Sequence, residues 1–270
     1  MTSSDCTVSQ WLAQLGLASR GEAKTWVMDG RVKIGGQPTL DPSARITPGK
    51  TTITLDGKRL PNAAPPRVYW MLHKPARVSS TGGTDDVASI YDLPRIKKLP
   101  FRVWAWPQLD FQAEGLVILT NDSVFLERSS ERGFRPQRQY QVLLSRRLTP
   151  EEIEHVTGGV KMRDGPAQLQ KLHYAQKANL GASTGAWYVI HSDDARRKFL
   201  TRLFAAFEVK IVKQVLLGIG ALRLPANLKS GQYRQMDAKE IRQLRRLGEE
   251  RPGTNARKRE PSRKTRSRES

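Results

Sequence analysis

The stretch that decides the fold is Trp106-Pro-Gln-Leu-Asp-Phe-Gln-Ala-Glu-Gly-Leu-Val-Ile-Leu-Thr-Asn-Asp122. Its second half, 115–120, is an almost unbroken apolar run between a glycine and an Asn-Asp pair, which predicts a strand buried on both faces. Upstream of this run, Asp110 stands between Leu109 and Phe111. Such a carboxylate either caps a turn or performs chemistry, because burial disfavours its charged form unless donors or cations compensate.

The composition of the 270 residues favours a nucleic-acid partner. Lys and Arg number 46 against 26 Asp and Glu, so the formal net charge is +20 and a polyanion is the expected ligand. No apolar stretch is long enough to span a membrane, and the first residues lack the pattern of a secretory signal. The single Cys6 excludes an intramolecular disulfide and a cysteine-based metal site. We therefore expect a cytoplasmic protein with no metal ion and no membrane contact.

The first unit, 8–60, is predicted to contain two helices followed by short strands. Apolar residues from 8 to 17 have helical spacing, and Ser19 to Glu22 matches a capping box that starts a second helix. Residues 32–34 and 51–55 alternate in polarity before turns that contain glycine. Four cations cluster near the second helix and the turn after it: Arg20, Lys24, Arg31 and Lys33. They form either an RNA-binding surface or a solvated basic face.

This unit resembles the alpha-L RNA-binding module that a small-subunit ribosomal protein shares with several RNA-modifying enzymes. The resemblance is carried by Leu15-Gly-Leu-Ala-Ser-Arg-Gly-Glu-Ala23 and by Gly30-Arg-Val-Lys-Ile-Gly-Gly36. In that family the second helix and the following turn lie on structured RNA. The resemblance therefore implies that the four cations bind RNA.

A proline-rich linker, 61–66, precedes a larger unit, 67–245, in which strands and helices alternate. Strands are predicted near 68–73, 102–106, 115–120, 139–145, 168–174, 186–192 and 209–224, and helices near 123–132, 149–157 and 195–207. The remainder, 246–270, is rich in arginine and lysine and lacks large apolar side chains after 250. We expect a disordered tail there, which acts either as a weak RNA-binding arm or as a solubilising segment.

Four segments of the larger unit together resemble the catalytic domain of ribosomal RNA pseudouridine synthases, in the branch that carries an alpha-L module in front. These segments are Tyr69–Pro75, Leu109–Asp122, Arg138–Val142 and Asp194–Phe204. Each is a weak match alone, but their order and spacing are kept over residues 8–245. The resemblance implies an α+β fold, in which helices flank a mixed and mostly antiparallel sheet. It also implies conversion of a uridine in structured ribosomal RNA to pseudouridine.

The chemistry of that reaction explains which residue types belong in the site. Breaking the N1–C1′ bond, turning the base and joining C5 to C1′ gains and loses no atom, so no cofactor is expected. The resemblance assigns the catalytic carboxylate to Asp110, which acts as a nucleophile or stabilises charge at C6 of the base or at the sugar. It assigns the cation that keeps this carboxylate ionised to Arg196, with Arg197 as the alternative. The resemblance also implies that Tyr140 is the aromatic residue that stacks on the uracil and could take the C5 proton. The target base has to leave its stack to reach these groups.

Further residues are expected around these three. Leu109 and Ile219 would form apolar walls, and four more cations would contact RNA: Lys74, Arg138, Arg197 and Lys198. By itself, Tyr140 is typical of a core residue on a strand, and Arg196 is typical of a phosphate contact or a solvated charge at a helix start. The joint match of all four segments favours the catalytic interpretation of both.

The sequence departs from the family pattern close to the predicted site. Pro107-Gln108 replaces Gly-Arg, Asp194-Ala195 replaces Glu-Gly, Phe199 replaces Gln, and Arg77 replaces Gly. These differences affect the groups that would position RNA more than the Asp–Tyr–Arg core. The alternative function is therefore a catalytically weak or inactive RNA-binding or ribosome-assembly protein on the same scaffold. In either case we expect a monomer.

Overall fold

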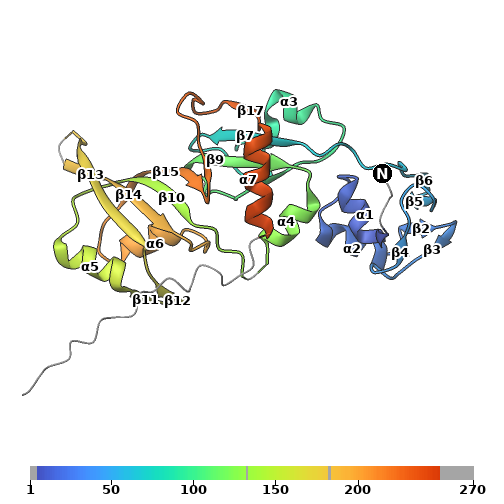
Figure 1. Cartoon of the computed structure of the whole chain (residues 1–270), viewed down its shortest axis with the longest axis horizontal. Helices are drawn as coiled ribbons and strands as arrows, with labels where there is room; N and C mark the ends of the chain where they lie inside the picture. Colours follow the sequence, from blue (N-terminus) through green and yellow to red (C-terminus); the bar gives the residue numbers. More distant parts are fainter. Residues whose placement is uncertain (1–4, 132, 182–183, 250–270) are drawn as a thin grey trace, which may run out of the picture.

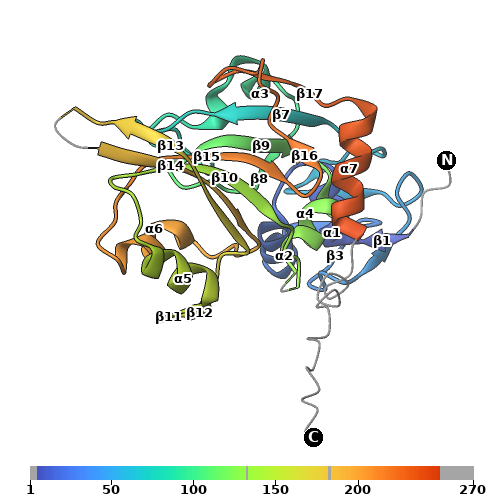
Figure 2. The same cartoon turned by 60° about the vertical axis from the view of Figure 1, so that its left-hand side comes forward.

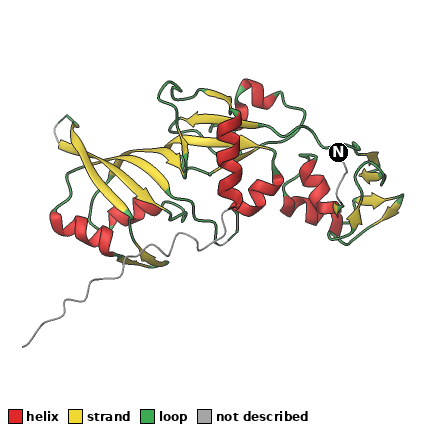
Figure 3. Ribbon diagram, viewed as in Figure 1, coloured by secondary structure: helices red, strands yellow, loops and turns green. Residues whose placement is uncertain are grey.

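The computed structural model describes residues 5–131, 133–181 and 184–249, which form two α+β units (Figures 1 and 3). The fold class predicted from the sequence is confirmed. Of the tail predicted for 246–270, residues 250–270 lie outside the described residues. Within the described residues, no helix is long and apolar enough to cross a membrane.

The first unit, at the right of Figure 1, has a small core of its own. Its elements are α1 (Val8–Gln14), α2 (Arg20–Met28), a four-stranded sheet in the order β3 (Gln37–Pro38), β2 (Val32–Ile34), β5 (Ile53–Leu55) and β6 (Lys58–Arg59), and a pair formed by β1 (Cys6–Thr7) and β4 (Arg45–Ile46). The predicted capping box is confirmed, because Ser19 Oγ accepts from the Glu22 N–H and the Glu22 carboxylate accepts from the Ser19 N–H at 2.7 Å. Trp11, Leu12 and Val27 are buried between the helices and the strands.

The second unit is built on a nine-stranded sheet. Its main order is β13 (Lys171–Asn179), β14 (Thr184–Ser192), β10 (Arg138–Leu144), β15 (Ile211–Ile219), β9 (Glu114–Thr120), β7 (Tyr69–Lys74) and β17 (Tyr233–Gln235), with β8 (Trp104–Trp106) on β9 and β16 (Leu222–Arg223) on β15. Among the described strands of this sheet, the β15–β9 pairing is parallel and the others are antiparallel. The seven predicted strands correspond to β7, β8, β9, β10, β13, β14 and the β15–β16 pair.

Helices pack on both faces of this sheet (Figure 2). One core cluster holds apolar residues of α4 (Ser123–Ser129), α5 (Pro150–Gly158), α6 (Phe199–Ala205) and α7 (Ala238–Glu249). A second cluster holds residues of η1 (Ile90–Asp92) and α3 (Pro94–Lys97). A small hairpin of β11 (Val160–Met162) and β12 (Gly165–Ala167) lies outside the main sheet, near α5 in Figure 1.

The central strand β9 is buried on both faces, as its apolar run predicts. Leu116 and Ile118 belong to the cluster with the four helices, whereas Val117 and Leu119 belong to the cluster with η1 and α3. The second residue of the strand is a glycine for a steric reason. Gly115 has φ +116°, and a Cβ at this position would collide with the backbone of Leu216 on β15. This close approach fixes where the loop that carries Asp110 enters the sheet.

Two boundaries differ from the sequence predictions. The segment 238–249 is helix α7, so residues 246–249, which the sequence places in the tail, are ordered, and Leu247 is buried against Gly220. The helix predicted from 195 begins only at Phe199, because Lys198 adopts a left-handed conformation with φ 50°. The segment 195–198 is therefore a loop, and its side chains can face a cavity.

The two units touch through a few polar contacts. The Arg102 N–H donates to the carbonyl of Gly16 at 3.2 Å, and the Arg102 guanidinium lies 3.3 Å from the Glu22 carboxylate. Arg20 at the start of α2 forms an ion pair with Glu127 of α4. These contacts place the first unit beside α4 (Figure 1).

Candidate active site

Residues from five separated places line one cavity of about 650 Å³ in the second unit. They come from Ser79–Thr81 after β7, Trp106–Phe111 between β8 and β9, Arg138 and Tyr140 on β10, Asp194–Leu200 before and within α6, and Gln214 on β15. Three of the four segments that carry the family resemblance therefore meet at this cavity. The fourth segment, Tyr69–Pro75, contains Lys74, which binds the loop that carries Asp110.

Asp110 lies in the loop between β8 and β9, and its side chain is half-buried at the cavity. Within the described part of the chain, its carboxylate makes no hydrogen bond or ion pair. The backbone on either side is held firmly. The Leu109 N–H donates to Ser80 Oγ at 3.0 Å, the Ser80 hydroxyl donates to the Leu109 carbonyl, and the Ala113 N–H donates to the Asp110 carbonyl at 3.0 Å. The loop is thus fixed while the carboxylate remains available to a ligand.

Lys74 holds the same loop from inside the protein. Its side chain is fully buried, and its ammonium donates to the carbonyls of Ala113 at 2.7 Å, Pro75 at 2.9 Å and Phe111 at 3.4 Å. Burial lowers the pKa of Lys74 to about 8, although the carboxylates of Glu114 and Asp110 oppose this shift. The prediction that Lys74 contacts RNA is wrong, because a buried ammonium with three carbonyl partners does not reach a ligand.

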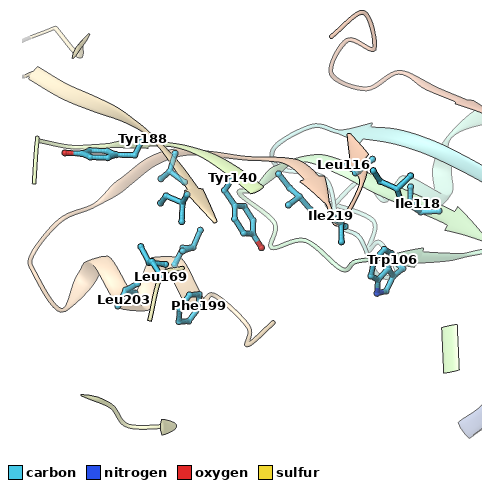
Figure 4. Close-up of a cluster of buried hydrophobic side chains, with 14 of the residues drawn as sticks. Trp106, Leu116, Ile118, Tyr140, Leu169, Tyr188, Phe199, Leu203 and Ile219 are labelled. Atoms are coloured by element: carbon cyan, nitrogen blue, oxygen red, sulfur yellow. The ribbon is translucent and has the colours of Figure 1, made fainter. Parts of the chain in front are cut away.

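Tyr140 projects from β10 into the space between Phe199 on α6 and Trp106 (Figure 4). Its side chain is buried, and burial raises the pKa of its phenol. The positive charge of Arg138 opposes this shift, and the carboxylates of Asp110 and Asp194 add to it. The phenol therefore stays neutral at ordinary pH. This favours stacking on a base over the proton-accepting part of the prediction.

Arg196 lines the cavity but is bound to other acids than Asp110. Its guanidinium donates to the Asp194 carboxylate, with Nη2 2.6 Å from Oδ2, and to the Asp164 carboxylate at 3.0 Å. It also donates to the backbone carbonyls of residues 164–166 in the β11–β12 turn. The structure thus differs from the predicted Asp110–Arg196 pair, since Asp194 is only two residues away and the hairpin supplies further acceptors.

The remaining residues predicted around the site divide into two groups. Leu109, Arg138, Arg197 and Lys198 line the cavity, and Arg138 donates to the carbonyl of Asp194 at 3.3 Å. Ile219 does not line it. It is fully buried in the core, opposite Arg138 in the β10–β15 register. The predicted wall at Ile219 is therefore wrong, because this side chain packs inside the sheet cluster.

Of the four cations predicted to bind RNA in the first unit, two are paired with carboxylates and two are exposed. Arg20 is engaged by Glu127, so its guanidinium joins the two units rather than facing a ligand alone. Arg31 pairs with the Asp56 carboxylate at 2.6 Å and stacks over the Trp26 ring. Lys24 and Lys33 are exposed. Among the four predicted cations, Lys24 and Lys33 are therefore the ones most accessible to an RNA phosphate.

Sequence reasoning missed three residues that shape the cavity. Ser80 anchors Leu109, and its only sequence signal was its place in Val78-Ser-Ser-Thr81 behind the Lys-Pro turn. Gln214 is a polar residue that lines the cavity from β15, and Asp164 binds Arg196 from a hairpin turn. Within 5–131, 133–181 and 184–249, no group of three or more His, Cys, Asp or Glu is arranged to hold a metal ion.

Comparison with known families identifies both units. The model described as S4 domain matches residues 8–51, in the unit that resembles the alpha-L module. The model described as RNA pseudouridylate synthase matches residues 68–235, which is more than half of the chain. The chain belongs to the RNA pseudouridylate synthase family. It is therefore an enzyme of an isomerase family, and the family predicted from the sequence is confirmed.

Individual relatives cover most of the enzyme's length. An uncharacterized RNA pseudouridine synthase of Aquifex aeolicus is 30% identical over 230 residues, covering 85% of this chain and 92% of that relative. The ribosomal large subunit pseudouridine synthase B of Bacillus subtilis is 26% identical over 249 residues, covering 91% and 97%. A crystal structure of a pseudouridylate synthase superposes with a TM-score of 0.58 at 22% identity over 88% of this chain and 99% of that one, which supports the fold.

Proposed function

We propose that the enzyme converts a uridine of ribosomal RNA to pseudouridine, with Asp110 as the catalytic carboxylate. The observation that carries the proposal is the meeting of Asp110 and Tyr140, 30 positions apart in sequence, at one cavity that Arg138, Arg197 and Lys198 also line. A relative named for the ribosomal large subunit supports ribosomal RNA as the substrate class.

In this proposal the target base leaves its stack and enters the cavity. The Asp110 carboxylate attacks either C6 of the base or C1′ of the sugar. The N1–C1′ bond breaks, the base turns, and C5 bonds to C1′. The bond to the Asp110 carboxylate breaks as well, so the carboxylate is regenerated. The proton lost from C5 is balanced by the proton that N1 gains, so the product is an isomer of the substrate and no cofactor takes part. The neutral ring of Tyr140 stacks on the uracil and holds its plane during the turn.

The cations at the cavity have different roles in holding the RNA. Arg138, Arg197 and Lys198 contact phosphates beside the flipped nucleotide, since phosphate contacts position a nucleic acid without reading its sequence. Arg196 holds the β11–β12 turn and Asp194 against the loop before α6, and so shapes one wall of the cavity. The S4 unit contributes Lys24 and Lys33 as a second point of attachment.

The test is direct. Recombinant protein is incubated with ribosomal RNA from a strain that lacks the homologous enzyme, and pseudouridine is mapped by carbodiimide-induced stops of reverse transcription. The wild-type protein should create a stop that Asp110→Asn does not create, while both proteins bind the RNA. RNA bound equally by both proteins with no pseudouridine from either would leave an RNA-binding or ribosome-assembly protein as the better account.

A further inference from the structure

Phe111, the residue after Asp110, occupies an unusual position in this molecule. Six large apolar side chains are exposed among the described residues: Met28, Leu40, Phe111, Val124, Tyr174 and Val212. Of these six, Phe111 is the one that lines the cavity, and it is 42% exposed. Single exposed apolar side chains are common on protein surfaces. A single exposed aromatic ring beside a reactive carboxylate at a cavity is much less easily explained by chance.

The backbone of Phe111 is fixed, although its ring is exposed. The Phe111 carbonyl accepts from the Arg77 N–H at 2.8 Å and from the Lys74 ammonium at 3.4 Å. The neighbouring residues are anchored by Ser80 on one side and by Lys74 on the other. The ring is therefore presented by a rigid loop, so little conformational entropy is lost when a ligand packs on it.

The other aromatic rings at the cavity do not share this exposure. Trp106 is 7% exposed, Tyr140 is 8% exposed and Phe199 is 4% exposed, because all three pack into the core of the sheet. These buried rings can meet a base that has entered the cavity. They cannot meet the bases that remain outside in the RNA stack, which leaves Phe111 for that contact.

We propose that Phe111 stacks on a base next to the target uridine and fills the space that the flipped uridine leaves in the RNA stack. The inference rests on the proposed function, since it places the flipped base at Asp110. Phe111 follows Asp110 directly in the chain and lines the same cavity, so its exposed ring is close to the RNA strand from which the base departs. Unstacking a base costs a few kcal/mol, and an inserted apolar side chain offsets part of this cost. A ring offers its face to any base, so the contact does not depend on the neighbour's identity.

The test compares single-turnover rates of pseudouridine formation at the uridine that wild-type protein modifies in ribosomal RNA. Phe111→Ala should lower this rate by roughly 10-fold to 100-fold, the range that corresponds to the loss of one base–aromatic stack. The dissociation constant for the RNA should change by less than about threefold, because the ring is engaged only after the base has left the stack. Phe111→Trp should keep the rate, and Phe111→Leu should not.

Tyr174→Ala is the matched control. Tyr174 is an aromatic residue that is also 42% exposed, and it lies on β13 outside the residues that line the cavity. Its replacement should leave the rate unchanged at a temperature where all variants are folded. A Phe111→Ala rate equal to that of Tyr174→Ala, or a Phe111→Leu rate equal to that of Phe111→Trp, would overturn the stacking role. Wild-type protein that makes no pseudouridine would overturn the proposed function and this inference with it.

Discussion

The two aspartates that flank β9 differ in the contacts that their carboxylates make. Asp122, after the strand, is buried, and its carboxylate accepts from the Tyr69 hydroxyl at 2.6 Å and from the Phe125 N–H at 3.3 Å. Arg67 lies 3.7 Å away. Asp110, before the strand, is half-buried, and its carboxylate has no hydrogen-bond or ion-pair partner within the described residues. The Asp122 carboxylate is thus engaged by groups of the protein, whereas the Asp110 carboxylate is available to a ligand.

The difference shows that an aspartate's role is decided by where its hydrogen bonds go, not by its type or its strand. Asp122 caps α4 and ties it to β7, so its contacts hold secondary structure together. Around Asp110 the protein instead fixes the backbone through Lys74 and Ser80. If Asp110 is catalytic as we propose, its rigid loop holds the carboxylate close to its working geometry before the substrate arrives, which reduces the entropy lost in the reaction.

The largest expected effect is on catalysis. Asp110→Asn keeps the shape of the side chain but removes the carboxylate that we propose as the nucleophile, so the single-turnover rate of pseudouridine formation should fall by at least about a thousandfold. The midpoint of thermal unfolding should stay within about 2 °C of the wild type, since the carboxylate makes no described contact that stabilises the fold. A large loss of thermal stability would show that Asp110 has a structural role like that of Asp122.

The next effect is on stability. Asp122→Ala leaves the Tyr69 hydroxyl and the Phe125 N–H without their acceptor, so the free energy of unfolding should fall by about 2–4 kcal/mol. Urea denaturation measures this change. The rate per folded molecule should remain close to that of the wild type. A variant as stable as the wild type would contradict the structural role of this carboxylate.

A third prediction concerns the buried Lys74 and its pH dependence. Its folded-state pKa of about 8 lies below its ordinary value of 10.5, so the folded state loses this proton first as the pH rises. The cost of burying the charge is fully present below pH 8 and is relieved between pH 8 and 10.5. The stability of the wild type relative to Lys74→Met should therefore increase over this window, by up to about 3 kcal/mol. A stability difference that is flat with pH would contradict the assignment.

The smallest effects are expected among the cations of the S4 unit, where the same contrast between engaged and available groups recurs. Lys24 is exposed, so Lys24→Gln should weaken RNA binding by roughly threefold at low salt and reduce the salt dependence by about one phosphate contact. Arg20 is held by Glu127, so Arg20→Gln should mainly loosen the contact between the units. Filter-binding titrations at several salt concentrations, together with limited proteolysis between the units, distinguish the two. Equal effects of both variants on RNA affinity would contradict the different roles of Lys24 and Arg20.

Much of the fold could be predicted because its patterns are local. The apolar run of β9 and the capping box at Ser19 each depend on residues close in sequence, and both are present. The meeting of Asp110 and Tyr140 followed from the family resemblance, not from periodicity. Helix α7 was missed because its apolar face consists of few residues, such as Leu244 and Leu247, among many charges.

The charge pairings could not be predicted, because they depend on competition between groups that the fold brings together. Arg196 pairs with Asp164 in a hairpin turn 32 residues earlier in the chain, and this acceptor competes with Asp110. Lys74 is the last residue of a strand and precedes a proline, a place where an exposed cation is as plausible as a buried one. The carbonyl of the neighbouring Pro75 and two carbonyls of the loop between β8 and β9 bind the ammonium and keep it buried.

The most direct test of the contrast between the two ends of β9 is one side-by-side measurement. Asp110→Asn and Asp122→Asn are incubated with the same ribosomal RNA at a temperature where both are folded, and pseudouridine is counted per folded molecule. We expect a yield within about threefold of the wild type for Asp122→Asn and none for Asp110→Asn. Pseudouridine from Asp110→Asn at the wild-type rate, or an equal loss in both variants, would contradict it.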